Sequence, residues 1–136
     1  MKKTIVIINE QHTILEEQKC LLNSKFTDGW EFLKVPSSGW TLEEQNQIKE
    51  DIIKYVDLFG FHGKSGNVVF VSPIPYLYGR LQIEFGYHVG NYDGNNGNYK
   101  NVSGNVYVFH NDKREKKELP NGKIISVTSK TGWQII

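Results

Sequence analysis

Side chains able to do chemistry gather at four points of the sequence, each directly after a short apolar run. The residues at these points are Asn9, Gln11, His12, Thr13, Ser37, Ser38, Trp40, Ser72, Pro73, Tyr76, Asn111, Lys113 and Arg114. Amides and hydroxyls hydrogen-bond base edges and ribose, aromatic rings stack on bases, and cations hold phosphates. This combination of side chains is typical of a nucleotide-binding site.

Each of these residues also has a structural interpretation that the sequence leaves open. His12 or Thr13 would cap a following helix. Trp40 would pack as a hydrophobic staple on the second helix, and the two serines before it would form only a turn. Tyr76 would be an ordinary surface or core aromatic residue.

Charge is distributed unevenly along the chain. Residues 1–100 carry ten basic and twelve acidic side chains, whereas residues 101–136 carry six and three. The C-terminal third is therefore basic on a slightly acidic body, which favours a local anion site around Lys113 and Arg114. The same basic run, residues 113–117, is also typical of a solvated surface. A total net charge of +1 argues against general DNA binding.

Several catalytic and cofactor motifs are missing from the sequence. There is no glycine-rich phosphate loop, dinucleotide fingerprint or GxSxG motif, and the four histidines lack metal-site spacing. We therefore expect no cofactor and no metal. Because Cys20 is the single cysteine, an internal disulfide is excluded. Cys20 lies within a predicted helix, and its side chain is expected in the hydrophobic core of the protein. The first apolar run, residues 4–8, is too short for a signal peptide or membrane span, so we expect a cytoplasmic protein.

The order of apolar patterns predicts the elements that position the candidate residues. Strands are expected at residues 4–8, 30–35, 67–71 and 106–109, with helices at 14–26, after Thr41, and at 76–85. Alternating strands and helices predict an α/β, Rossmann-like three-layer domain with a mostly parallel sheet. Ligands of such sheets bind beyond the carboxyl ends of the strands, where the candidate residues lie.

The C-terminal part is predicted to be β-rich, within one domain spanning residues 1–136. Strands are expected at 124–128 and 133–136, joined by a hairpin turn at 130–132. Residues 120–122 form a second turn, but the segment before it is too charged to be a clear strand. Residues 90–105, rich in Gly and Asn, are expected to form a flexible insertion.

The segment at residues 9–18 (NEQHTILEEQ) resembles the start of small stand-alone ancillary proteins of type III CRISPR systems. These belong to the CRISPR-associated Rossmann-like (CARF) group. Their first strand is followed by Ser/Asn-His, then Leu-Thr, then Glu-Gln opening a helix. His12 and Gln18 carry most of the resemblance, whereas Ile14 and Leu15 stand where Leu-Thr is usual. The chain is also similar in build to phage proteins that capture immune second messengers.

The resemblance implies a homodimer or larger symmetric oligomer that binds a cyclic oligoadenylate, without a membrane or long nucleic acid as partner. Some members of the group only bind the messenger, as sponges, and others are ring nucleases that cleave it without metal. We expect binding and sequestration. Ring cleavage is the alternative, with His12, Lys113 and Arg114 as candidate catalytic residues. A protein-interaction module that uses the 90–105 loop is the third possibility.

Overall fold

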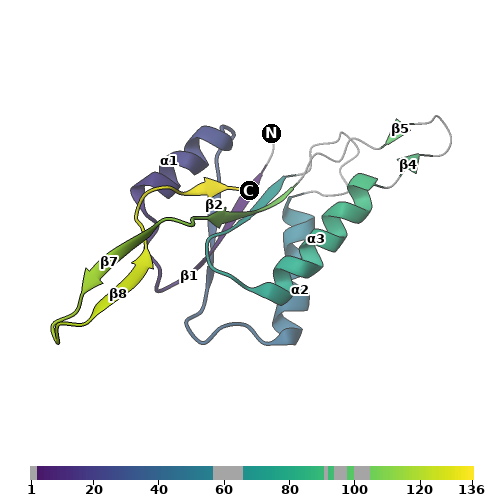
Figure 1. Ribbon diagram of the computed structural model, residues 1–136. Coiled ribbons are helices and arrows are strands. Elements are labelled where there is room, and N and C mark those ends of the chain that lie inside the picture. The colour runs from purple at the N-terminus through teal and green to yellow at the C-terminus, as the bar shows by residue number, and fades with distance from the viewer. Residues whose placement is uncertain (1–2, 57–65, 91, 94–97, 100–104) are drawn as a thin grey trace.

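A five-stranded, mostly parallel sheet in the order β2-β1-β3-β6-β9 forms the centre of the protein. The computed structural model describes residues 3–56, 66–90, 92–93, 98–99 and 105–136 (Figure 1). The parallel strands are β1 (Thr4–Asn9), β2 (Glu31–Val35), β3 (Asn67–Phe70) and β6 (Val106–His110). Strand β9 (Gln134–Ile135) pairs antiparallel with β6. The expected α/β class with a mostly parallel sheet is confirmed.

Helices cover both faces of this sheet. Helices α2 (Leu42–Tyr55) and α3 (Pro75–Gly90) contact each other on one face, where Ile5 and Ile7 of β1 point. Helix α1 (Glu16–Lys25) packs on the other face, against Val6. Strand β1 is buried on both sides, which is why its sequence is a continuous β-branched run.

The chain changes direction at the boundary between β1 and β3. The connection through α1 leads from β1 to β2 at one edge, whereas the later connections through α2 and α3 lead the other way across the sheet. The loops after β1 and β3 therefore leave toward opposite faces of the sheet. This reversal is the usual ligand position in open α/β sheets.

The start of α1 differs from the sequence-based expectation. The helix begins at Glu16, with Leu15 as the N-cap, so capping by His12 or Thr13 is wrong. The buried Gln18 side chain takes over part of the capping, because its Oε1 accepts the Leu15 N–H at 3.1 Å. Cys20, expected in the core, is exposed on this helix.

The start of α2 follows the sequence closely. Thr41 Oγ1 accepts the Glu44 N–H at 3.1 Å, and Glu44 Oε1 accepts the Thr41 N–H at 3.2 Å. This reciprocal capping box satisfies two backbone donors that the helix leaves unpaired.

A separate antiparallel hairpin, β7 (Arg114–Glu118) and β8 (Ile124–Thr128), projects away from the sheet (Figure 1). The charged segment is thus a strand, because nearly all side chains on both faces of this ribbon reach water. The expected hairpin between 124–128 and 133–136 is wrong. The chain instead turns back at Gly132, and Ile136 exchanges two backbone hydrogen bonds of 3.0 Å with Val108, at β6.

The Gly/Asn-rich stretch is described only in part. Helix α3 continues to Gly90, and two short strands, β4 (Tyr92–Asp93) and β5 (Asn98–Tyr99), pair antiparallel. The rest of the insertion expected at 90–105 lies outside the described residues, apart from Asn105. Among the described residues, no helix is both long and apolar enough to cross a membrane.

Candidate functional site

The carboxyl ends of β1 and β3 bring together three residues that the sequence singled out. The Asn9 N–H, at the end of β1, donates to Ser72 Oγ at 2.8 Å. The same oxygen lies 2.9 Å from Nδ1 of His12, in the loop that leads to α1. Ser72 is buried, whereas His12 is exposed. Burial of Ser72 fixes the position of an imidazole that stays accessible to a ligand.

The Ser72 hydroxyl can orient the His12 ring in either tautomer. Ser72 Oγ can accept from Nδ1–H or donate its own O–H to an unprotonated Nδ1, because a hydroxyl both donates and accepts. The other ring nitrogen, Nε2, has no protein partner among the described residues. Nε2 is therefore the nitrogen that remains available to a ligand.

Asn9 shapes the loop that holds the imidazole. Its Oδ1 accepts the Gln11 N–H at 2.9 Å, and its backbone oxygen accepts the His12 N–H at 2.9 Å. This is an Asx turn, in which a short amide side chain mimics a backbone turn. Gln11 and Thr13 are both exposed on this loop.

Glu10, which sequence reasoning missed, links the end of β1 to the end of β2. Its N–H donates to the Val35 oxygen at 2.8 Å, and its Oε1 accepts the Ser37 N–H at 2.8 Å. Hydrogen bonds from the Ser37 backbone and side chain lower the pKa of the Glu10 carboxyl. The carboxylate is thus an exposed acceptor two residues before His12 in the chain. In the sequence, Glu10 lies between the candidate residues Asn9 and Gln11, and nothing else there marked it as part of the site.

The residues chosen after β6 form the base of the hairpin. Asn111 Nδ2 donates to the backbone oxygens of Ser129 and Thr131, at 3.0 and 2.9 Å. Lys113 Nζ donates to Thr131 Oγ1 at 3.2 Å, and an Arg114 guanidinium nitrogen donates to Thr128 Oγ1 at 2.6 Å. Asn111 therefore has a structural role, while both cations are exposed and held by hydroxyls.

Glu17 attaches this hairpin base to the start of α1. Its Oε1 accepts the N–H groups of Gly132 and Trp133, each at 2.8 Å. Because α1 directly follows the His12 loop, the anchor brings the hairpin base to the same end of α1 as the imidazole. Within the described residues, however, no hydrogen bond or ion pair joins His12 to Lys113 or Arg114.

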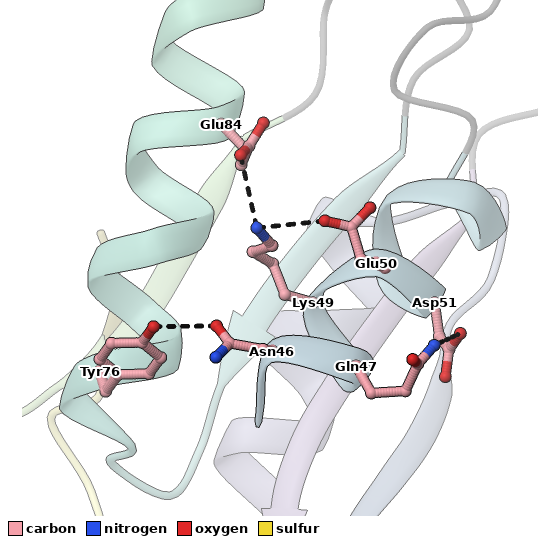
Figure 2. Close-up of polar contacts among 7 residues, drawn as sticks. All are labelled: Asn46, Gln47, Lys49, Glu50, Asp51, Tyr76 and Glu84. Carbon is pink, nitrogen blue, oxygen red and sulfur yellow. Dashed lines mark hydrogen bonds and ion pairs between the residues drawn. The ribbon is translucent and has the colours of Figure 1, made fainter. Parts of the chain in front are cut away.

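The other chosen residues do not join the His12 cluster. The Tyr76 hydroxyl points to α2 and donates to Asn46 Oδ1 at 2.8 Å, beside the Lys49 ion pairs with Glu50 and Glu84 (Figure 2). Trp40 packs on the core beneath α2, consistent with its structural interpretation. Ser38 and Pro73 are exposed.

Comparison with known proteins identifies no relative of this chain, so its function is inferred from the geometry of the site. A scan against protein-family models finds no match to the chain, and searches of curated proteins and of solved structures find none either. In the described part of the chain, no three His, Cys, Asp or Glu side chains are grouped so that they could hold a metal ion. The site offers hydrogen-bonding groups: an imidazole, a carboxylate and exposed amides.

Proposed function

We propose that this protein binds a cyclic oligonucleotide of the cyclic oligoadenylate type at the carboxyl edge of its sheet and sequesters it. The observation that carries the proposal is the His12–Ser72 contact of 2.9 Å, located where the chain direction reverses between β1 and β3. The resemblance of segment 9–18 to CARF proteins supports the same ligand class. The buried Ser72 hydroxyl holds the exposed His12 ring in one orientation. A loop that only faces solvent would not need such a contact.

The groups around His12 suit nucleotide recognition. Nε2 of His12 would hydrogen-bond a base edge or a ribose hydroxyl, and the Glu10 carboxylate would accept from an amino group or ribose hydroxyl. Phosphates would lie toward Lys113 and Arg114, away from the Glu10 charge. The Glu17 anchor keeps those cations at a fixed position relative to α1.

Sequestration is favoured over cleavage by the contacts of the two central side chains. Cleavage by a ribose 2′-OH needs a base aligned with the hydroxyl and a donor at the leaving oxygen. Ser72 is buried and accepts a backbone hydrogen bond, so its role is to position His12. Among the described contacts, no cation lies within hydrogen-bond reach of the imidazole.

A homodimer completes the proposal, because a ligand with two-fold symmetry is best matched by two copies of one pocket. Light scattering of the free protein at micromolar concentration should report a dimer or a larger symmetric oligomer. A monomer both with and without ligand would contradict this part of the proposal.

The decisive experiment compares wild-type protein with His12→Ala in cyclic tetraadenylate. We expect wild type to retain the ligand and return it intact after long incubation, and His12→Ala to bind it more weakly. His110→Ala is the matched control, because His110 is also partly exposed but pairs with Asp112 instead. Linear oligoadenylate formed by wild type and not by His12→Ala would make the protein a ring nuclease. Absence of binding by wild type would reject both activities.

A further inference from the structure

A second cavity, of about 240 Å³, opens at the amino edge of the sheet, opposite the His12 site. Its lining comes from the first residues of β1 and β3, the residue before β6 and the end of α1. The volume is below the range of about 300 to 1,000 Å³ for pockets that hold drug-sized ligands. A ligand of this cavity is therefore small.

Two buried polar side chains, Thr4 and Asn67, line the cavity and make few hydrogen bonds within the protein. Thr4 is 3% exposed and Asn67 is 8% exposed, and they are direct neighbours in the β1–β3 register. The only hydrogen bond of the Asn67 carboxamide among the described residues goes to Thr4 Oγ1, at a long 3.4 Å. Its oxygen and second N–H have no protein partner there. The carboxamide oxygen is not among the buried side-chain atoms of the described residues that lack a partner, so it reaches the open space of the cavity. A ligand in the cavity could therefore hydrogen-bond it.

Two of the eight residues that line the cavity are aromatic, and the other six are polar or charged. Phe26 and Tyr107 meet edge to face, with ring centroids 5.6 Å apart. The Lys25 ammonium lies 4.8 Å from the centre of the Tyr107 ring, and Asp28 lines the same cavity. One cation and one carboxylate together give no preference for an anion. Ring surface beside polar groups suits a flat molecule with hydrogen-bonding edges.

We infer that this cavity binds a purine base or its nucleoside, with adenine as the best match. An Asn carboxamide matches the adjacent donor and acceptor of adenine, N6–H and N7, in two hydrogen bonds. Those two bonds would use the carboxamide oxygen and the N–H that the fold leaves unpaired. The Thr4 hydroxyl, next to the carboxamide, supplies a further donor. This site is independent of the His12 site, since it lies at the other edge of the sheet.

The test titrates adenine, adenosine and, separately, inorganic phosphate into the full chain, followed by NMR of backbone and side-chain amides. We expect the Asn67 side-chain resonances and the Thr4 amide to shift with adenine or adenosine and to stay unchanged with phosphate. Asn67→Leu should weaken adenine binding at least about tenfold, given the strength of a two-bond base contact. Thr4→Val, which keeps the side-chain shape, should weaken it less.

Two controls separate a ligand site from a structural role. Asn67→Leu should leave the melting temperature of the free protein unchanged or raised. The carboxamide makes only one long hydrogen bond within the described residues, so an apolar side chain can replace it at little cost. His12→Ala, at the opposite edge, should leave adenine binding unchanged. The inference is overturned if neither purine shifts Asn67, if phosphate alone binds near Lys25, or if Thr4→Val and Asn67→Leu both bind adenine like wild type.

Discussion

Glu17 and Gly132, 115 positions apart in the sequence, are joined by a hydrogen bond of 2.8 Å from the Gly132 N–H to the Glu17 carboxylate. The same oxygen accepts the N–H of Trp133. This contact holds the turn between β8 and β9 on the first turn of α1. It therefore couples the projecting hairpin to the helix that follows the His12 loop.

Removal of this anchor should loosen the C-terminal strand. Glu17→Ala leaves both N–H groups without their acceptor, so we expect the free energy of unfolding to fall by about 1.5–3 kcal/mol, the range for hydrogen bonds to charged groups. Hydrogen exchange of the Val108 and Ile136 amides should accelerate. Glu17→Gln keeps an acceptor oxygen and should lose less. Unchanged exchange in Glu17→Ala would show that the anchor does not stabilise β9.

Ser72 should matter for both stability and ligand affinity. Ser72→Ala leaves the Asn9 N–H unpaired at a partly buried position, which should cost about 1–3 kcal/mol in the free energy of unfolding. The His12 ring would also lose the contact that orients it, so affinity for cyclic tetraadenylate should fall. Ser38→Ala, at an exposed serine, should change stability by less than about 0.5 kcal/mol. Equal behaviour of the two variants in urea unfolding and ligand titration would contradict the positioning role.

Arg114 tests whether the hairpin base holds phosphate. Arg114→Ala should weaken binding of cyclic tetraadenylate by about 1.5–3 kcal/mol, since a charged donor is lost. Its melting temperature should hardly change, because the side chain is exposed. Lys116→Ala, two residues further along the same strand, is the control and should bind like wild type. If calorimetry gives the same affinity for Arg114→Ala and wild type, the basic run is solvated surface only.

Glu10 should make stability depend on pH in the acid range. Its pKa in the folded protein lies below the ordinary value of 4.5, because Ser37 donates hydrogen bonds to the carboxylate. The resulting stabilisation is present above pH 4.5 and is lost as the pH falls through the folded pKa. Urea unfolding should therefore show a smaller stability difference between wild type and Glu10→Gln at pH 3 than at pH 7. A difference that grows toward pH 3 would contradict this assignment.

The elements whose residues interact locally were predictable from the sequence. The β-branched run of β1, the capping box at Thr41 and the turn at residues 120–122 all depend on neighbours a few positions away. Such short-range preferences fix backbone conformation and burial nearly independently of the rest of the chain. The α/β class and the location of candidate groups at strand ends followed from these elements.

The predictions that failed concern competition between distant segments. The C-terminal strand has a nearby partner in β8, yet it pairs with β6, where Ile135 packs against the same core cluster as Phe109. Thr13 was a reasonable cap for α1, but Leu15 is the N-cap, and the Gln18 side chain accepts its N–H from within the helix. Trp40 packs on the core and Tyr76 hydrogen-bonds Asn46 of α2, so neither joins the His12–Ser72 contact.

The sequence by itself determined the strands and helices of the parallel sheet and its covering layers, because hydrophobic period and capping act over a few residues. The charged strand β7 has no such pattern and appeared only in the structure. Only the tertiary structure decided which polar groups meet. The pairing of His12 with Ser72, of Glu10 with Ser37 and of Glu17 with Gly132 each depends on how separate loops converge at strand and helix ends. Convergence of this kind reflects the packing of the whole sheet, and no local pattern in the sequence encodes it.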